Sequence, residues 1–361
     1  MQGEKQYKTG LDVGSTTAKI VIIDESGQTV FSRYERHNAQ VNDLLSAYFR
    51  EARQELGNIE TSIAVTGSVG MGTAEQLRTE FIQEVVAATR YAQQLYPSAS
   101  ALIDIGGEDA KVVLFQGNHI DLRMNGNCAG GTGAFIDQMA VLLGVDIEEL
   151  SRLALQAEHI HPIAARCGVF SKTDIQNLVS RNVPLGDIAA SIFHAVAVQT
   201  IVTLSRGWTF HPPILLCGGP LTFIPALRKA FADYLHLQES DFILPASGNL
   251  LPALGCALCA TEEKAVSLST LENLISRSTN ITTKNSLPPL FDSETDYDNW
   301  KKEKAHYNWP SAPLVQGIQE AVLGIDSGST TTKIVVTTPD GAILFSHYAP
   351  NLGNPIEAVR K

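Results

Sequence analysis

The sequence predicts an α/β fold in which two similar strand sets are each followed by helices. Residues 9–34 contain three short β-branched runs, TGLDVG, AKIVIID and QTVFSRY, and ESG forms a hairpin turn between the last two. Residues 100–125 repeat this design as ALIDIGGED, AKVVLFQG and NHIDLRMN. Helical spacing dominates residues 133–207. Both strand sets follow the order strand, Asp-Gly turn, strand, turn, strand, which indicates two copies of one unit.

The segments between and after the strand sets have regular patterns of their own. Helical spacing predicts helices at residues 42–55, 81–94 and 250–264. Apolar runs predict buried strands at residues 62–66 and 213–217, and a glycine-rich turn follows each of them. Strands and helices therefore alternate along most of the chain.

Composition and charge exclude several classes of protein. The 361 residues carry a net charge of −11, and 44% of them are hydrophobic, as in soluble globular proteins. Nucleic acid is excluded as the main partner, because phosphate contacts need clustered Lys and Arg. The N-terminus has no apolar signal core, and a charge, Gly or Pro interrupts every long apolar run. We therefore expect a cytoplasmic protein that does not contact a membrane.

A second copy of the opening motif begins near residue 323. LGIDSGSTTTKIVV (323–336) repeats TGLDVGSTTAKIVI (9–22) at a constant offset of 314 residues. The stretch at 267–318 is polar and contains prolines, which predicts a linker. A strand meander alone cannot bury a domain core, so we expect residues 319–361 to be the truncated start of a second domain.

The first turn, Asp12-x-Gly14-Ser15-Thr16-Thr17, joins two predicted strands. Its glycine lets the backbone approach a phosphate, and its hydroxyl and N–H groups donate hydrogen bonds. The aspartate at the strand end has the chemistry to hold Mg²⁺ or its bound water. Lys19 lies just inside the next strand and adds a positive charge. The turn is therefore a candidate phosphate site.

Two further turns have matching chemistry. Asp104-Ile105-Gly106-Gly107 ends the first strand of the second set, and Cys217-Gly218-Gly219-Pro220 joins a buried strand to a helix. A lone Asp-Gly turn is weak evidence for a phosphate site. Three such turns in one chain favour a clamp on a nucleoside triphosphate and its Mg²⁺. The alternative, a purely structural β-hairpin protein, needs three independent coincidences.

These turns resemble the phosphate 1, phosphate 2 and adenosine motifs of the ASKHA superfamily, which includes actin, Hsp70 and hexokinase-like sugar kinases. The resemblance covers about residues 5–265. It implies an ATPase domain over residues 1–266, with two RNase H-like subdomains around a nucleotide cleft. Subdomain I is expected at about 5–97 plus a closing helix at 250–266, and subdomain II at about 98–249.

The five cysteines are an odd number, which is poor evidence for disulfides: Cys128, Cys167, Cys217, Cys256 and Cys259. Cys128 precedes the loop Gly130–Gly133, and Cys167 precedes a segment in which Ser171 or Thr173 would cap a helix. Both lie before predicted helix N-termini, where partial positive charge stabilises a thiolate. Two thiolates are half of a Cys₄ iron–sulfur site, and a two-fold dimer would supply the other half. The alternative is two unrelated buried cysteines.

Three longer segments carry a more specific resemblance. NGNCAGGTGAFIDQMA, RCGVFSKTDIQNLV and PLGDIAASIFHAVA resemble the activators of 2-hydroxyacyl-CoA dehydratases and the ATPase subunits of benzoyl-CoA reductase. The resemblance implies an ATPase coupled to electron transfer, in which Cys128 and Cys167 of two chains ligate one [4Fe–4S] cluster in a homodimer. It also implies a dehydratase or reductase component as electron acceptor and a ferredoxin or flavodoxin as donor. The duplicated N-terminus resembles large family members that contain two fused domains.

ATP or ADP and Mg²⁺ are the ligands implied for the cleft. We expect Asp12 and Asp104 to hold the water shell of Mg²⁺, and Asp104 or Glu108 to orient the attacking water. Glu108 stands where short activators tend to have glutamine, so its carboxylate either positions water or repels the γ-phosphate. Glu84 either reaches the cleft or is a solvated helix carboxylate. The other nucleotide-binding residues are expected to be Gly14, Ser15, Thr16, Thr17, Lys19, Gly106, Gly107, Gly131, Thr132, Gly133, Gly218, Gly219 and Pro220.

Two other functions fit parts of this pattern. A small-molecule kinase, for example a sugar kinase, would use the same cleft, and its cysteines would be incidental. A nucleotide-dependent scaffold of the Hsp70 or actin kind would bind nucleotide without a cluster. Iron bound to an anaerobically purified dimer would distinguish the activator from both alternatives.

Overall fold

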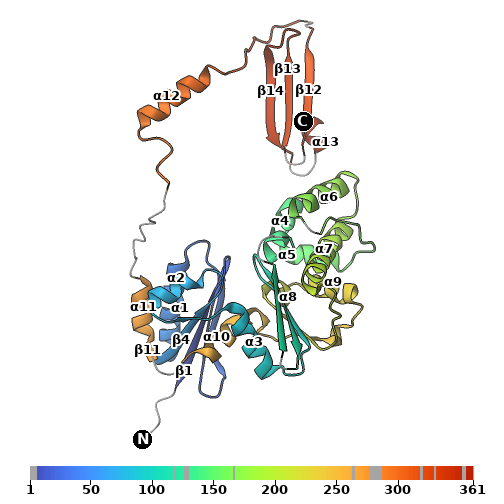
Figure 1. The fold of residues 1–361 in the computed structure, drawn as a ribbon. Coiled ribbons are helices and arrows are strands. Elements are labelled where there is room, and N and C mark those ends of the chain that lie inside the picture. The colour runs from blue at the N-terminus through green and yellow to red at the C-terminus, as the bar shows by residue number, and fades with distance from the viewer. Residues whose placement is uncertain are drawn as a thin grey trace. The chain divides into compact units, whose positions relative to one another are not determined.

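The computed structural model describes residues 6–117, 119–125, 130–165, 167–261, 265–276, 287–317, 320–328, 331–351 and 355–360. The chain divides into two compact units. The first comprises residues 1–175 and 183–278, and the second comprises residues 176–182 and 279–361. The first unit contains two sheets, and the second contains a third sheet (Figure 1).

The first sheet is built on the opening meander, in the order β11-β4-β1-β2-β3. Its antiparallel core is β1 (Tyr7–Val13), β2 (Thr17–Ile23) and β3 (Thr29–Arg36). β4 (Glu60–Thr66) lies parallel to β1 and also pairs with β5 (Glu80–Phe81) and β11 (Ala265–Ser267). Three helices share an apolar core with one face of this sheet: α1 (Val41–Leu56), α2 (Gly70–Leu77) and α11 (Leu268–Ser276).

The second sheet repeats this arrangement in the order β10-β9-β6-β7-β8. Its antiparallel core is β6 (Ala101–Ile105), β7 (Ala110–Gln116) and β8 (His119–Asn125). β9 (Ile214–Cys217) lies parallel to β6, as β4 does to β1, and β10 (Phe242–Ile243) lies parallel to β9. In both sheets the aspartate of the turn pairs with a lysine on the next strand, Asp12 with Lys19 and Asp104 with Lys111. The prediction of two copies of one design is confirmed.

Two helices lie between these sheets, α3 (Glu84–Leu95) and α10 (Leu251–Cys259) (Figure 1). They touch at Gly255, where a Cβ atom would collide with the carbonyl oxygen of Ala87. A side chain at Gly10 on β1 would likewise collide with the carbonyl oxygen of Ala253 on α10. The glycines therefore allow backbone-to-backbone packing where the two halves of the first unit join.

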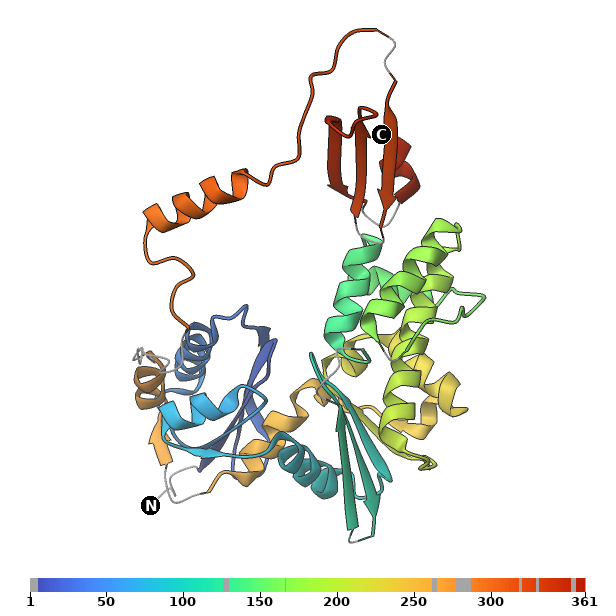
Figure 2. The ribbon, with the colours of Figure 1, turned by 45° about the horizontal axis from the view of Figure 1, so that its top comes forward.

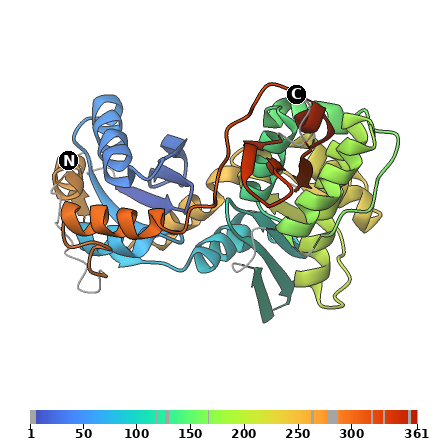
Figure 3. The same cartoon turned by 90° about the horizontal axis from the view of Figure 1, so that it is seen from above.

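Further helices accompany the second sheet (Figures 2 and 3), and residues 176–180 of one of them belong to the second unit. They are α4 (Gly133–Leu143), α5 (Ile147–Ala154), α6 (Gly168–Ser180), α7 (Leu185–Ser205), α8 (Gly219–Phe223) and α9 (Pro225–Leu235), with single 3₁₀ turns at Glu239–Asp241 and Gly248–Leu250. Helix α7 is long and apolar enough to cross a membrane, contrary to the expectation that no run reaches that length. However, 67% of the most apolar 18-residue stretch of this helix is buried in the fold, and the helix packs against α5, α9, β7 and β8. It is the core helix of this half.

The second unit contains a helix and a second meander, which Figure 1 draws in orange and red. α12 (Glu294–Ala305) begins at Ser293, whose side chain accepts a hydrogen bond from the backbone N–H of Asp296. β12 (Val322–Ser327), β13 (Thr331–Thr337) and β14 (Ile343–Pro350) form an antiparallel sheet, and α13 (Pro355–Arg360) follows. Asp326 and Lys333 face each other in the register that joins Asp12 to Lys19.

The structure differs from the sequence-based expectations at three further points. Residues 267–276, assigned to the linker, complete β11 and form α11, whose apolar side chains enter the core of the first sheet. The glycine-rich turn predicted after residues 62–66 continues as helix α2 from Gly70 onward. Ser171 does not cap α6, because it lies inside the helix. Its hydroxyl donates to the carbonyl oxygens of Ala164 and Cys167, whereas a capping hydroxyl would accept a hydrogen bond from a backbone N–H.

Candidate nucleotide site

The first turn is held in place by its own backbone and by His37. The N–H of Gly14 donates to the carbonyl oxygen of Thr17 at 3.0 Å. The backbone N–H of His37 donates to the carbonyl oxygen of Thr16 at 3.2 Å, and the imidazole Nε2 of His37 donates to that of Gly14 at 3.1 Å. These contacts fix the turn before any ligand binds, which lowers the entropy cost of binding.

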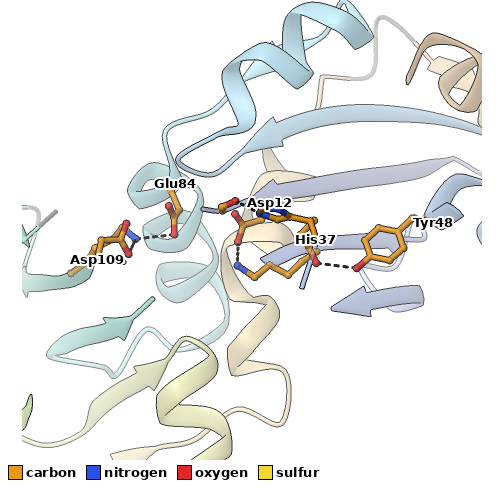
Figure 4. Close-up of polar contacts among 9 residues, drawn as sticks. Asp12, His37, Tyr48, Glu84 and Asp109 are labelled. Atoms are coloured by element: carbon orange, nitrogen blue, oxygen red, sulfur yellow. Dashed lines mark hydrogen bonds and ion pairs between the residues drawn. The ribbon is translucent and has the colours of Figure 1, made fainter. Parts of the chain in front are cut away.

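Asp12 and Lys19 form a buried ion pair beneath this turn (Figure 4). The ammonium Nζ of Lys19 donates to Oδ2 of Asp12 at 2.7 Å, and the two side chains are 14% and 1% exposed. Burial alone would lower the pKa of Lys19, but the Asp12 carboxylate outweighs it and the pKa is raised. The second carboxylate oxygen, Oδ1 of Asp12, is buried without a hydrogen-bond partner among the residues that the structure describes. A water molecule bound to a cation would satisfy this oxygen.

The second turn also places an aspartate opposite a lysine, but this lysine bonds to other carboxylates. The N–H of Gly106 donates to the carbonyl oxygen of Asp109 at 2.8 Å. Asp104 is 3% exposed, and burial raises its pKa while the nearby ammonium of Lys111 acts in the opposite direction. Lys111 donates to Oε1 of Glu84 and to Oδ1 of Asp109, both at 2.8 Å. Each half of the unit therefore places one aspartate and one lysine at the end of its first two strands.

Glu84 brings a fourth carboxylate to this site, beside those of Asp12, Asp104 and Asp109, from the N-terminus of α3 (Figure 4). Burial, together with the negative charges of Asp12 and Asp104, raises its pKa to about 7, although Lys111 opposes this shift. A carboxyl group with this pKa can accept a proton near neutral pH. From the sequence alone, Glu84 fits a cleft residue and a solvated carboxylate equally well, because a charged residue at a helix N-terminus is also typical of a solvated position.

The two turns face each other across one cleft. A Cβ atom at Gly107 would collide with the hydroxyl of Thr16, so the turns touch. Glu84, Asn249 and Pro252 line the cleft beside them. Ten of the predicted site residues also line it: Thr16, Thr17, Lys19, Asp104, Gly106, Gly107, Gly133, Gly218, Gly219 and Pro220. The structure thus gathers residues from three predicted turns at one place.

The third turn forms the other end of the cleft. Gly218 has a φ of +87°, and a side chain there would collide with the carbonyl oxygen of Ile105. The hydroxyl of Tyr34 on β3 reaches Gly219 from the opposite half, and its ring lies 5.7 Å from that of Phe223. Ile136 and Ile147 add apolar surface nearby. Glycine backbone and flat apolar surface together suit a nucleoside.

A glycine loop connects the cleft to the N-terminus of α4. The N–H of Gly133 donates to the carbonyl oxygen of Gly106 at 2.9 Å, and that of Ala134 donates to that of Gly107 at 2.7 Å. Thr132 is fully buried, and Gly131 has a φ of +88°. The first turn of α4 is therefore bonded to the second phosphate turn.

The amino-acid sequence matches a known family. The sequence profile of the BadF/BadG/BcrA/BcrD ATPase family matches residues 9–260. The chain belongs to this family.

Relatives within the BadF/BadG/BcrA/BcrD family carry specific names. A 2-hydroxyisocaproyl-CoA dehydratase activator from Clostridioides difficile is 28% identical over 74% of this chain and 100% of its own. A (R)-2-hydroxyglutaryl-CoA dehydratase activating ATPase from Acidaminococcus fermentans is 29% identical over 72% of this chain and 98% of its own.

Solved structures agree with these relatives. Component A of the (R)-2-hydroxyglutaryl-CoA dehydratase from A. fermentans superposes with a TM-score of 0.62 at 25% identity, over 70% of this chain and 97% of its own. The 2-hydroxyisocaproyl-CoA dehydratase activator from Clostridium difficile, with bound ADPNP, superposes with a TM-score of 0.60 at 26% identity, over 76% of this chain and 99% of its own. The chain has the ASKHA fold expected from its sequence.

One of the two predicted cluster ligands of this BadF/BadG/BcrA/BcrD ATPase, Cys167, does not line the cleft. Cys167 is half-buried and directly precedes α6, and its carbonyl oxygen accepts hydrogen bonds from the N–H and the hydroxyl of Ser171, both at 2.9 Å. Cys128 and Ala129 lie outside the described residues. Within the described part of the chain, no three His, Cys, Asp or Glu residues cluster as a metal site.

The other predicted residues take different positions. Asp12 lies beneath the first turn, and Gly14 and Ser15 belong to that turn without lining the cleft. Gly131 and Thr132 support the loop before α4. Glu108 is exposed and does not line the cleft. Glu84 is therefore better placed than Glu108 to act on a ligand there.

Proposed function

We propose that this protein is an ATP-hydrolysing activator that passes a low-potential electron to a 2-hydroxyacyl-CoA dehydratase or a related CoA-ester reductase. One observation carries the proposal: two turns, each with an aspartate and a lysine, face each other across a cleft, and the glycine loop of this cleft follows Cys128 in the sequence. The names of the two relatives above support the same role.

In this proposal the cleft binds ATP with Mg²⁺. Thr16, Thr17 and Lys19 hold phosphate oxygens, Ser15 supports the turn beside them, and Asp12 and Asp104 hold the water shell of the cation. The unpartnered buried Oδ1 of Asp12 fits that shell. Mg²⁺ would neutralise charge on the phosphates. Glu84 lies among these groups and orients the attacking water, because its raised pKa lets it accept a proton near neutral pH.

The nucleoside is assigned to the other end of the cleft. The backbone of Gly218, Gly219 and Pro220 contacts the ribose and base, and the ring of Phe223 packs against them. Glycines are needed at 218 and 219 because side chains there would collide with the carbonyl oxygen of Ile105 and the hydroxyl of Tyr34. Gly106, Gly107 and the loop Gly131–Gly133 complete the phosphate side.

Cys128 and Cys167 are assigned to the cluster, in a homodimer that places four thiolates around it. The described cysteine fits, because Cys167 lies at the start of α6, where the helix dipole stabilises a thiolate and an anionic group. A [4Fe–4S] cluster would supply the one-electron carrier. A ferredoxin or flavodoxin is the proposed donor, the dehydratase or reductase component the acceptor, and the cytoplasm the location.

The second unit is proposed to be part of a second domain of the same kind. Its Lys333 Nζ donates to Oδ2 of Asp326 at 2.6 Å, as Lys19 does to Asp12. The N–H of Gly328 donates to the carbonyl oxygen of Thr331 at 3.0 Å, the same contact that closes the first turn. We assign residues 319–361 to this second repeat.

Iron and sulfide analysis of anaerobically purified protein tests the cluster. We expect about four iron atoms per two chains, as for one Cys₄-type cluster. Cys128→Ser and Cys167→Ser should each remove that iron while leaving ATP binding intact. The matched control is Cys259→Ser, which changes a partly exposed cysteine of α10 and should keep the iron. Iron retained by Cys128→Ser would show that the ligand assignment is wrong.

A further inference from the structure

We propose that Arg36 and Asp137 form a positioning pair that couples closure of the nucleotide cleft to helix α4. The inference rests on the proposed function only in its consequence, because α4 is the helix that follows the Cys128 segment. The contact itself is independent of any cluster.

The pair spans the cleft. Arg36 is the last residue of β3 in the first half, and Asp137 lies in the second turn of α4 in the other half. Nη2 of Arg36 donates to Oδ2 of Asp137 at 2.8 Å, and both side chains line the cleft. An ion pair across a cleft forms when its walls approach and breaks when they separate.

Helix α4 is also fastened to the second phosphate turn. Its first two backbone N–H groups, of Gly133 and Ala134, donate to the carbonyl oxygens of Gly106 and Gly107. The N-terminus of α4 is therefore hydrogen-bonded to the second phosphate turn. One helical turn later, Asp137 is paired with Arg36 on the opposite side of the cleft. A ligand that draws the two sides of the cleft together would therefore move α4 through both contacts. We expect this movement to reach the Cys128 segment, because that segment precedes α4 in the chain.

The second meander provides an internal comparison. Pro350 faces Thr331 there, at the register position where Arg36 faces Thr17. That meander still forms the Lys333–Asp326 ion pair, and Lys333 lies 6.0 Å from the Tyr348 ring, as Lys19 lies 5.8 Å from the Tyr34 ring. An arginine at this position is thus unnecessary for the meander or its turn. Its role in the first unit lies in the contact with Asp137.

The exposure of the pair suits a reversible contact. The side chains of Arg36 and Asp137 are 55% and 30% exposed, and ion pairs this accessible to water contribute little to overall stability. The pair therefore adjusts the balance between open and closed forms without holding the fold together. Screening by salt should weaken it.

Steady-state ATPase kinetics and hydrogen exchange test the pair. We expect Arg36→Gln and Asp137→Asn each to lower kcat by about two- to fivefold, the range of an exposed ion pair, with little change in KM for MgATP. Both should reduce the protection that a non-hydrolysable ATP analogue gives to backbone amides of residues 134–143. The charge-reversed double variant Arg36→Asp with Asp137→Arg should restore both readouts.

The control is Lys229→Gln, which breaks an exposed ion pair with Asp233 within α9 and should leave both readouts unchanged. Single variants that match the unsubstituted protein in exchange and kcat would overturn the proposal, as would a double variant whose losses add. Hydrogen exchange is measured on protein without a cluster. The result for the Arg36–Asp137 pair therefore does not depend on iron. If the unsubstituted protein purified under anaerobic conditions held no iron, only the proposed function would be contradicted.

Discussion

At the scale of single residues, the protonation of Glu84 should control ATP hydrolysis. Its pKa is raised from 4.5 to about 7, so the carboxylate that accepts a proton is lost as the pH falls below 7. We expect kcat/KM for MgATP to rise between pH 6 and 8 with an apparent pKa near 7. The folded state holds this proton more tightly than the unfolded chain, so its contribution to stability is lost as the pH rises through 7.

Two carboxamide variants separate Glu84 from Glu108. Glu84→Gln should lower kcat by about 10²-fold, the lower range for loss of a proton acceptor, and should abolish the acid limb of the pH profile. Glu108→Gln should change kcat by less than about threefold, because Glu108 is exposed and does not line the cleft. A pH profile that loses its acid limb only in Glu108→Gln would reverse the assignment.

The sequence predicts the turns well because their chemistry is local. Asp12, Gly14 and Lys19 lie within eight positions, and strand pairing alone brings the aspartate to the lysine. The sequence does not reveal the role of Glu84, because its partner Lys111 lies 27 positions away and only packing of α3 against the second sheet joins them. Lys111 was not singled out, although its place seven residues after Asp104 repeats the spacing from Asp12 to Lys19.

At the scale of elements, the junction between α3 and α10 depends on Gly255. A methyl group there would meet the carbonyl oxygen of Ala87, and backbone cannot move aside as a flexible side chain can. We expect Gly255→Ala to lower the free energy of unfolding by about 1–3 kcal/mol, as overpacking does. Gly72 in α2 has nothing within 4 Å, so Gly72→Ala should raise it by about 0.5–1 kcal/mol. Urea titrations in which both variants shift the same way would contradict this account.

Helix α11 belongs to the first unit, although the sequence predicts a linker at this position. Its residues Leu268, Leu271 and Ile275 recur at helical spacing, a signal that the sequence offered. The serines and threonines around them, followed by a proline-containing polar stretch, favoured a linker instead. Pairing of β11 with β4 is non-local, so only the fold shows that this segment returns to the first sheet.

At the scale of the whole molecule, we therefore expect folding of the first sheet, and of the side of the cleft that it forms, to require α11. Leu268 and Leu271 are 0% exposed and Ile275 is 1% exposed. Burying three such side chains contributes about 5–9 kcal/mol in total, which is comparable with the stability of an entire domain. A chain ending at 278 should unfold cooperatively and bind MgATP, whereas one ending at 266 should lose both properties. Thermal unfolding followed by circular dichroism, with nucleotide binding by calorimetry, compares the two chains. If the chain ending at 266 bound MgATP as tightly as the longer one, α11 would be an appendage, and the first sheet would owe its stability to α1 and α2 alone.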